Sequence, residues 1–191
     1  MAGLFATPKT QEITEREKLT TKYQNARHNI LLVLVFTLIN IVLLVSNSNS
    51  YFLFSAAIPY YSAVFGMIFT GKYPAEYYTG ELAGMEFLGN GFFVATLVFA
   101  AVILVLYLLS WILSKKPRVG WMIFALVLFI LDTGAMLLIS GISADMIMDI
   151  VFHGWVIVSL ISGISAYFKL KQLPEEEEPF PVEKKPVPIE E

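Results

Sequence analysis

Long apolar runs dominate the chain and alternate with shorter polar stretches. Four of the runs cover residues 29–45, 92–114, 119–141 and 146–168. About 20 helical residues, each rising about 1.5 Å, cross the roughly 30 Å of hydrocarbon in a bilayer. The first run is at the short end of the allowed range, and the other three reach the full length. The pattern therefore predicts four transmembrane helices.

Two of these runs form a predicted helical hairpin. Residues 92–114 and 119–141 are joined by the basic turn Lys115–Arg118. Short loops that carry Lys and Arg stay on the cytoplasmic side of a membrane, so this turn is expected inside the cell. An aromatic belt is expected at the cytoplasmic ends of the two helices, made by Tyr107, Trp111 and Trp121.

A fifth apolar stretch, residues 51–69, carries Pro59 at its centre. If it crossed the membrane, either the basic hairpin turn or the basic N-terminal segment would lie outside. If it does not cross, both termini are cytoplasmic, and every Lys and Arg except Lys72 lies inside. The charge distribution thus favours four spans. Residues 51–69 are predicted to be a re-entrant or interfacial segment, whose backbone must be covered by protein wherever it enters the membrane.

Residues 46–91 form the longest segment between two spans and are expected to cap the outer face. Pro74 suits the start of a helix at the interface, and Gly89 and Gly91 suit its end. A segment of this length with its own apolar residues is typical of a packed or functional element. Its side of the membrane is acidic and would attract cations or a basic partner. The acidic residues, opposed by Lys72 alone, are Glu76, Glu81, Glu86, Asp145 and Asp149.

The polar N-terminal segment, residues 1–28, is expected in the cytoplasm. Thr14 and Glu17 have the spacing of a capping box, which predicts that a helix begins there. Four apolar residues then share one helical face: Leu19, Tyr23, Ala26 and Ile30. The helix can therefore continue into the first span.

The C-terminal residues 172–191 combine a run of glutamates with interspersed prolines. Such a composition cannot bury a core, so this tail is predicted to be disordered, extended and cytoplasmic.

Composition places the chain among integral membrane proteins. Of its 191 residues, 57% are hydrophobic, more than the roughly 45–50% of soluble domains. The absence of Cys excludes disulfides and thiolate chemistry. The predicted fold is an all-α, four-transmembrane-helix bundle with a re-entrant or interfacial outer segment. We expect a multi-pass protein of the plasma membrane.

Polar side chains inside the predicted spans are candidates for function because they are costly there. Asn40 lies in the first span, Asp132 in the third and His153 in the fourth. Counted along their helices, all three lie on the order of 10–13 Å below the outer interface. Asp149 precedes His153 by one helical turn and shares its face. These four residues form the candidate intramembrane polar site.

Three interpretations of this site stay open. It can be a satisfied polar network that fixes the register of the bundle. It can be a solute or proton site open to the outer face, since chains of Asp and His serve as proton relays. It can also be a metal centre, although His153 is the only histidine within the spans. The prediction assigns no metal, no cofactor and no catalytic residue.

Small residues in the fourth span, Ser159 and Gly163 among them, predict close helix packing. The heptapeptide Leu-Ile-Ser-Gly-Ile-Ser-Ala occurs at 138–144 and again at 160–166. Because the copies would lie at opposite membrane faces, we attribute the repeat to chance or to shared packing needs.

Recognisable catalytic patterns are missing from the sequence: it has no HExxH, no GxSxG, no P-loop and no dinucleotide-binding glycine pattern. A basic groove with interleaved aromatic residues, as nucleic acid would require, is missing too. The expected role is a non-enzymatic accessory or interaction component of a membrane complex. Its partners would be the lipid bilayer and other membrane proteins or a second copy. The alternative is a small transporter or a membrane-embedded enzyme with an outward-facing Asp/His site.

Overall fold

The computed structural model describes residues 14–48, 50–115 and 118–173. Those residues form five α-helices and three single-turn 3-10 helices, and contain no strand. Four of the α-helices are long and apolar enough to cross a membrane. The predicted all-helical class is therefore confirmed, and so is the prediction of four helices with the length and composition of membrane spans.

The long helices lie close to the predicted apolar runs, except that the first begins well before its run. They are α1 (Glu15–Val45), α3 (Asn90–Leu113), α4 (Val119–Ser140) and α5 (Ile147–Leu170). The fifth helix, α2 (Ala57–Phe69), is short and lies within the ambiguous stretch. The 3-10 turns are η1 (Ala75–Tyr77), η2 (Gly80–Leu82) and η3 (Ala144–Met146).

The start of α1 has the predicted capping box. The Glu17 amide donates to Thr14 Oγ1 at 3.2 Å, and the Thr14 amide donates to Glu17 Oε2 at 2.8 Å. The predicted apolar face is also confirmed, because Leu19, Tyr23, Ala26 and Ile30 are all buried. One continuous helix thus runs from the polar N-terminal segment through the first apolar run.

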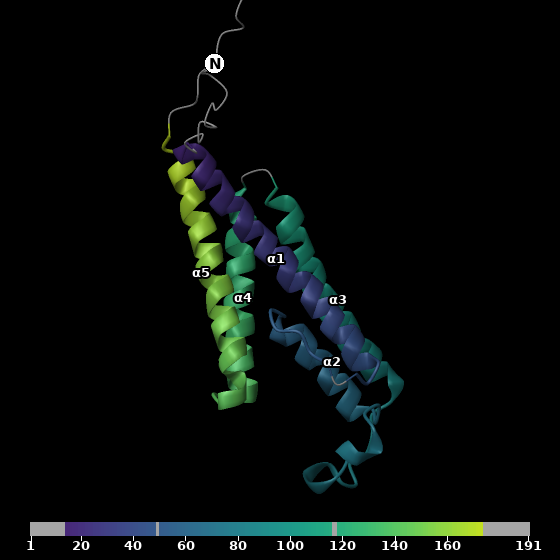
Figure 1. The fold of residues 1–191 in the computed structure, drawn as a ribbon. Coiled ribbons are helices and arrows are strands. Elements are labelled where there is room, and N and C mark those ends of the chain that lie inside the picture. Colours follow the sequence, from purple (N-terminus) through teal and green to yellow (C-terminus); the bar gives the residue numbers. More distant parts are fainter. Residues whose placement is uncertain (1–13, 49, 116–117, 174–191) are drawn as a thin grey trace, which may run out of the picture.

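The two ends of the molecule are formed by different parts of the chain (Figure 1). The start of α1, the end of α3, the start of α4 and the end of α5 lie together at one end, which we call the terminal end. Residues 46–91 gather at the opposite end, which we call the cap end. Toward the cap end, α4 and α5 diverge from α1 and α3 (Figure 1). Helix α2 lies between the two pairs and packs on α3, α1 and α4.

Two close helix contacts depend on glycine. A Cβ atom at Gly163 of α5 would collide with the Cβ of Ala26 in α1 and would lie 3.1 Å from Met122 Sδ. A Cβ atom at Gly66 of α2 would collide with the side-chain hydroxyl of Thr96 in α3. The first contact holds α5 against α1, and the second seats α2 on α3.

The predicted interfacial helix after Pro74 does not form, so that prediction is wrong. Only the single turns η1 and η2 are helical between α2 and α3. Gly80 and Gly84 have φ angles of +59° and +75°, in the left-handed region that a right-handed helix cannot contain. The part of the cap between α2 and α3 is therefore an irregular loop with two short turns.

Candidate functional site

The carboxylate of Asp132 binds the N-terminus of α2. The Ala57 amide donates to Asp132 Oδ2 at 2.8 Å, and the Ile58 amide donates to Oδ1 at 2.7 Å. The residue before the helix, Ala56, has no side chain that could cap it. The first N–H groups of a helix carry a partial positive charge and lack partners within the helix. Asp132 of α4 therefore supplies the N-terminal capping group that the residues next to α2 do not provide.

Two side chains of α1 hold the extended residues that lead into α2. The Thr37 hydroxyl accepts from the Ala56 amide at 2.7 Å and donates to the Val33 carbonyl at 2.6 Å. Asn40 forms a pair of bonds with Phe52: its Nδ2 donates to the carbonyl at 2.7 Å, and its Oδ1 accepts from the amide at 2.8 Å. An unpaired backbone group is costly in an apolar interior. These bonds therefore allow the non-helical segment before α2 to lie in the interior.

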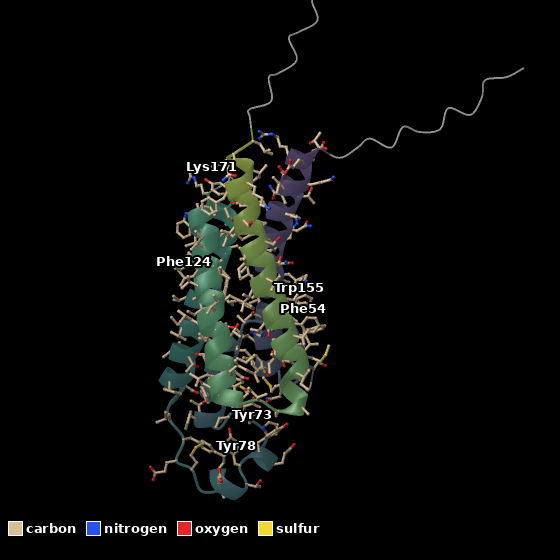
Figure 2. The ribbon with its side chains drawn as sticks, turned by 90° about the vertical axis from the view of Figure 1, so that its left-hand side faces the viewer. Phe54, Tyr73, Tyr78, Phe124, Trp155 and Lys171 are labelled. Atoms are coloured by element: carbon tan, nitrogen blue, oxygen red, sulfur yellow. The ribbon has the colours of Figure 1, made fainter. Side chains whose placement is uncertain are left out.

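Phe54 turns the chain between these two anchoring points. Its φ angle is +71°, a conformation that is strained for a bulky residue. The ring lies 3.8 Å from that of Phe152 and 5.8 Å from that of Trp155, between centroids (Figure 2). Packing of the ring against α5 offsets the cost of the strained backbone.

His153 lies next to Asp132, with both of its ring nitrogens near oxygen atoms. Nδ1 is 2.8 Å from the Asp149 carbonyl, and Nε2 is 3.5 Å from Asp132 Oδ2. The ring stacks on Phe129 at 5.0 Å between centroids. A neutral imidazole can donate from one nitrogen only. Nδ1–H can donate to the Asp149 carbonyl, and Nε2 is then a buried nitrogen without a hydrogen-bond partner.

The side chains of Asp132 and His153 are only 1% and 3% exposed, so this conformation keeps the pair away from solvent. A further buried polar atom without a hydrogen-bond partner is the hydroxyl of Tyr107, whose ring lies 6.5 Å from that of Phe129. Tyr107 was expected in an aromatic belt, but it is buried in the core, and that prediction is wrong. The error arose because sequence position gives the depth of a residue and leaves its helical face open.

The structure brings together two of the four predicted site residues. Asp132 and His153 are in contact, whereas Asn40 binds the backbone of Phe52. Asp149 contributes its backbone carbonyl to His153. Among the described residues, no three His, Asp or Glu side chains gather as a metal site would require.

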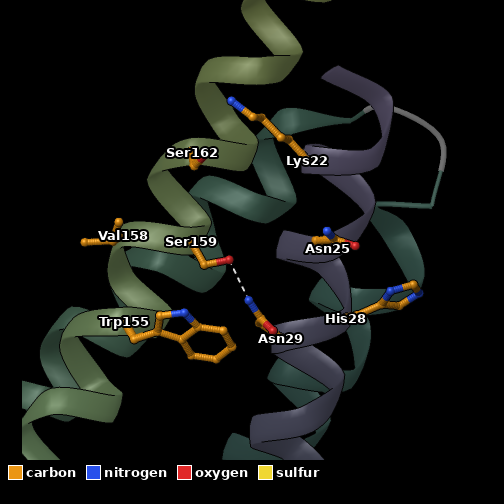
Figure 3. Close-up of a pocket in the computed structure, with 8 residues that line it drawn as sticks. All are labelled: Lys22, Asn25, His28, Asn29, Trp155, Val158, Ser159 and Ser162. Carbon is orange, nitrogen blue, oxygen red and sulfur yellow. Dashed lines mark hydrogen bonds between the residues drawn. The ribbon is translucent and has the colours of Figure 1, made fainter. Parts of the chain in front are cut away.

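The residues predicted for helix packing both lie on the side of α5 that meets α1. Gly163 is buried against Ala26, as described above. The Ser159 hydroxyl accepts a hydrogen bond from Asn29 Nδ2 of α1 (Figure 3). This part of the small-residue face is thus used for packing within the chain.

Sequence reasoning missed the buried cation Arg27, which binds the end of α3. Its guanidinium Nη2 donates to the Trp111 carbonyl at 3.1 Å, and Nε donates to Ser114 Oγ at 3.2 Å. The Tyr23 hydroxyl donates to the Ser114 carbonyl at 2.9 Å. The last turn of α3 has no basic residue of its own, although a cation is favoured there. The only signal was that Arg27 follows Tyr23 by one helical turn on the predicted buried face.

A hollow of about 280 Å³ opens in the cap. Tyrosines from three segments line it, namely Tyr51, Tyr60, Tyr73 and Tyr77. Burial, with a smaller contribution from neighbouring tyrosines, raises the pKa of Tyr73 to about 12, so this phenol stays protonated at neutral pH. Figure 2 shows Tyr73 and Tyr78 together at the cap end. The Tyr78 hydroxyl accepts from the Tyr73 amide at 3.1 Å and lies 3.3 Å from the carbonyls of Met67 and Ile68 at the end of α2.

These contacts fasten α2 at both of its ends with side chains from other segments. Comparison with known proteins adds no assignment, because no protein-family model, curated protein or solved structure matches the chain. The arrangement itself must therefore indicate what the protein does.

Proposed function

We propose that the protein is a non-enzymatic component of a membrane complex and that its cap, residues 46–91, binds another membrane protein. The observation that carries this proposal is the role of Asp132. Both oxygens of its carboxylate accept backbone N–H groups of α2, and the side chain is sealed from solvent. A buried carboxylate thus serves to position the cap.

The proposal includes a placement in the plasma membrane. The four long helices form a four-helix bundle that spans it, with both termini in the cytoplasm. The helix ends that lie at the terminal end of the molecule carry Lys115, Arg118 and Lys169, as the positive-inside rule requires. Residues 51–69 form a re-entrant segment that enters and leaves on the outer side. Asp132 is eight residues from the end of α4, so α2 begins about 12 Å inside the helix end.

The surface of the cap fits a partner with basic residues outside the membrane. Glu76, Glu81 and Glu86 are exposed there. Lys72 is half-buried, and its ammonium group lies 4.9 Å from the centroid of the Phe93 ring. Opposite charges on two surfaces steer the partners together and select against wrong ones. Tyr77, on the rim of the tyrosine-lined hollow, is half exposed, and tyrosine is among the residues enriched at protein interfaces.

Site-specific photo-crosslinking in cells tests this proposal. A photoreactive residue replaces Tyr77 in the cap or, as a control, Val98 on the exposed side of α3. We expect a discrete protein adduct from position 77 and none from position 98. The charge-reversed chain with Glu76→Lys and Glu81→Lys should lose the adduct.

A second charge reversal distinguishes binding through the cap from binding through the acidic tail. The changes Glu176→Lys and Glu177→Lys alter the net charge equally but lie outside the described residues. The adduct at position 77 should survive them. An adduct that only the tail variant abolishes, or one that forms equally at position 98, would contradict binding through the cap.

A second candidate function, proton-linked transport, is favoured by the position of His153 between two oxygen acceptors. A proton held between His153 and Asp132 is a component that relays use. Proteoliposomes with a trapped pH-sensitive dye test this candidate. A proton flux that Asp132→Asn abolishes and Asp149→Asn preserves would support transport over the proposed interaction role.

A further inference from the structure

A groove of about 460 Å³ lies between α1 and α5 in the half of the molecule nearer the terminal end (Figure 3). Its α1 side is polar and carries Lys22, Asn25 and His28. Its α5 side includes Trp155 and Val158, which are 48% and 65% exposed. Figure 3 shows Lys22 at one end of the groove and Trp155 at the other. The groove therefore has a basic end at Lys22 and an exposed apolar side chain, Trp155, at the other end, with polar side chains such as Asn25 and Asn29 along α1.

The depth of this groove follows from neighbouring contacts. Gly163 packs against Ala26 and Met122, and Met122 is in the first turn of α4. Trp155 precedes Gly163 by eight residues in α5, which places it about 12 Å further from the terminal end. In the proposed placement the groove thus begins near the ends of the helices, among lipid headgroups, and continues into the hydrocarbon layer.

The charge of the groove is one-sided. None of the described residues that line it is acidic. An adjoining hollow of about 420 Å³ shares Lys22 and adds Lys18 and Lys169, with Glu15 as its one carboxylate. Clusters of basic residues next to a membrane attract anionic lipid.

We infer that this groove binds one anionic phospholipid from the cytoplasmic leaflet. The phosphate lies beside Lys22, where Asn25 can donate a further hydrogen bond, and an acyl chain lies along Trp155 and Val158. A phospholipid matches the whole groove, because its charged group and its chain have the same order as the basic and apolar parts. A soluble anion would use the basic end alone. The inference rests on the proposed membrane placement.

Native mass spectrometry of the full chain, released from mild detergent, tests the inference. The protein is incubated with phosphatidylglycerol and phosphatidylcholine that have identical acyl chains. We expect one phosphatidylglycerol to be retained in preference to phosphatidylcholine. Replacing Lys22 by Ala should weaken this retention about fivefold, the effect of one basic residue at a charged membrane surface. His28→Ala should have a smaller effect, because the His28 ring points away from Lys22 (Figure 3).

Two other variants serve as controls for charge and for the apolar part. Lys72→Ala removes the same charge at the cap end and should leave retention unchanged. Trp155→Ala should reduce the retention of both lipids, because it removes the surface for the acyl chain. Lys22, His28 and Trp155 are exposed, so these changes do not open the core. Equal retention of the two lipids by the unaltered chain, or equal effects of Lys22→Ala and Lys72→Ala, would overturn the inference.

Inorganic phosphate distinguishes a lipid site from a site for a free anion. Millimolar phosphate should fail to displace the bound phosphatidylglycerol, and complete displacement would overturn the assignment to lipid. Extraction of membranes with alkaline carbonate tests the placement separately. Release of the chain by carbonate would refute the membrane placement itself, whereas a carbonate-resistant chain without lipid preference would refute the lipid site alone.

Discussion

Replacing Asp132 by Asn tests how α2 is held between the long helices. The carboxylate accepts from two amides, those of Ala57 and Ile58, at 2.8 and 2.7 Å. An asparagine side chain has one oxygen and one NH₂ group in place of the two oxygens. Whichever way the amide is oriented, one backbone N–H then faces a donor and loses its acceptor. The change leaves the volume of the side chain almost unaltered, so its effect is electrostatic.

The magnitude follows from the cost of an unpaired buried donor. Removing one partner of a buried hydrogen bond costs about 1–3 kcal/mol. Loss of the negative charge at the N-terminus of α2 adds about 0.3–1 kcal/mol. Because about 1.4 kcal/mol corresponds to a factor of ten, the population in which α2 has left its seat should rise at least about fivefold, and up to several hundredfold.

Cysteine labelling can measure this opening because the chain has no Cys of its own. Ser55 is 1% exposed, next to the start of α2, and Ser55→Cys introduces a single thiol there. A membrane-impermeant maleimide reacts with that thiol only when the segment opens toward water. Its modification rate, measured while opening and closing are fast, is therefore proportional to the open population.

The matched control is Asp149→Asn, which removes a carboxylate from α5. Asp149 contributes its backbone carbonyl to His153, and that carbonyl survives the change. We expect the labelling rate at position 55 to rise at least fivefold in the Asp132→Asn chain and to change less than twofold in the control. A rate that stays within twofold in both chains, or rises equally in both, would refute the role assigned to Asp132.

Three further changes test the other contacts. Gly163→Leu forces a side chain between α1 and α5 and should cost about 1–3 kcal/mol, seen as a melting temperature several degrees lower in detergent; Gly154→Leu, with open space around it, is the control and should have little effect. Arg27→Met removes the bonds to the end of α3 and should lower the melting temperature in the same assay, and an unchanged value would contradict the assigned contacts. Tyr78→Phe removes the hydroxyl that accepts from the Tyr73 amide, so limited proteolysis should cut the cap several-fold faster, while an unchanged rate would show that this bond does not hold the cap.

The long helices could be predicted from the sequence because the thickness of a bilayer fixes the length of an apolar run. Helix α2 could not be predicted in the same way. Pro59, which made its stretch ambiguous, is the third residue of the helix, where a missing N–H costs nothing. The N-terminal capping group of α2 is the side chain of Asp132, 75 residues further along the chain. No local signal could mark a helix start whose cap comes from so far along the chain.

The candidate site was predicted in its residues but only partly in its arrangement. Counting along the helices placed Asp132 and His153 at matching depths, and they are in contact. Depth did not show that the carboxylate binds backbone amides, because that depends on where the chain before α2 lies. Arg27 was missed for a related reason: its partners are carbonyl groups at the end of α3, and backbone partners leave no trace in a sequence.

The helices are held together by different kinds of contact at the two ends of the molecule, and this difference bears on function. At the terminal end, helices contact one another directly, through Arg27 on α3 and through the Gly163–Ala26 contact. At the cap end the α4–α5 pair diverges from α1 and α3, and the segment between the two pairs binds α1 through Asn40 and α4 through Asp132 (Figure 1). A partner that displaced the cap outward would therefore have to break the bonds between α2 and Asp132. Breaking them would leave a buried carboxylate beside His153, at a large cost in free energy unless water or a proton entered with the movement.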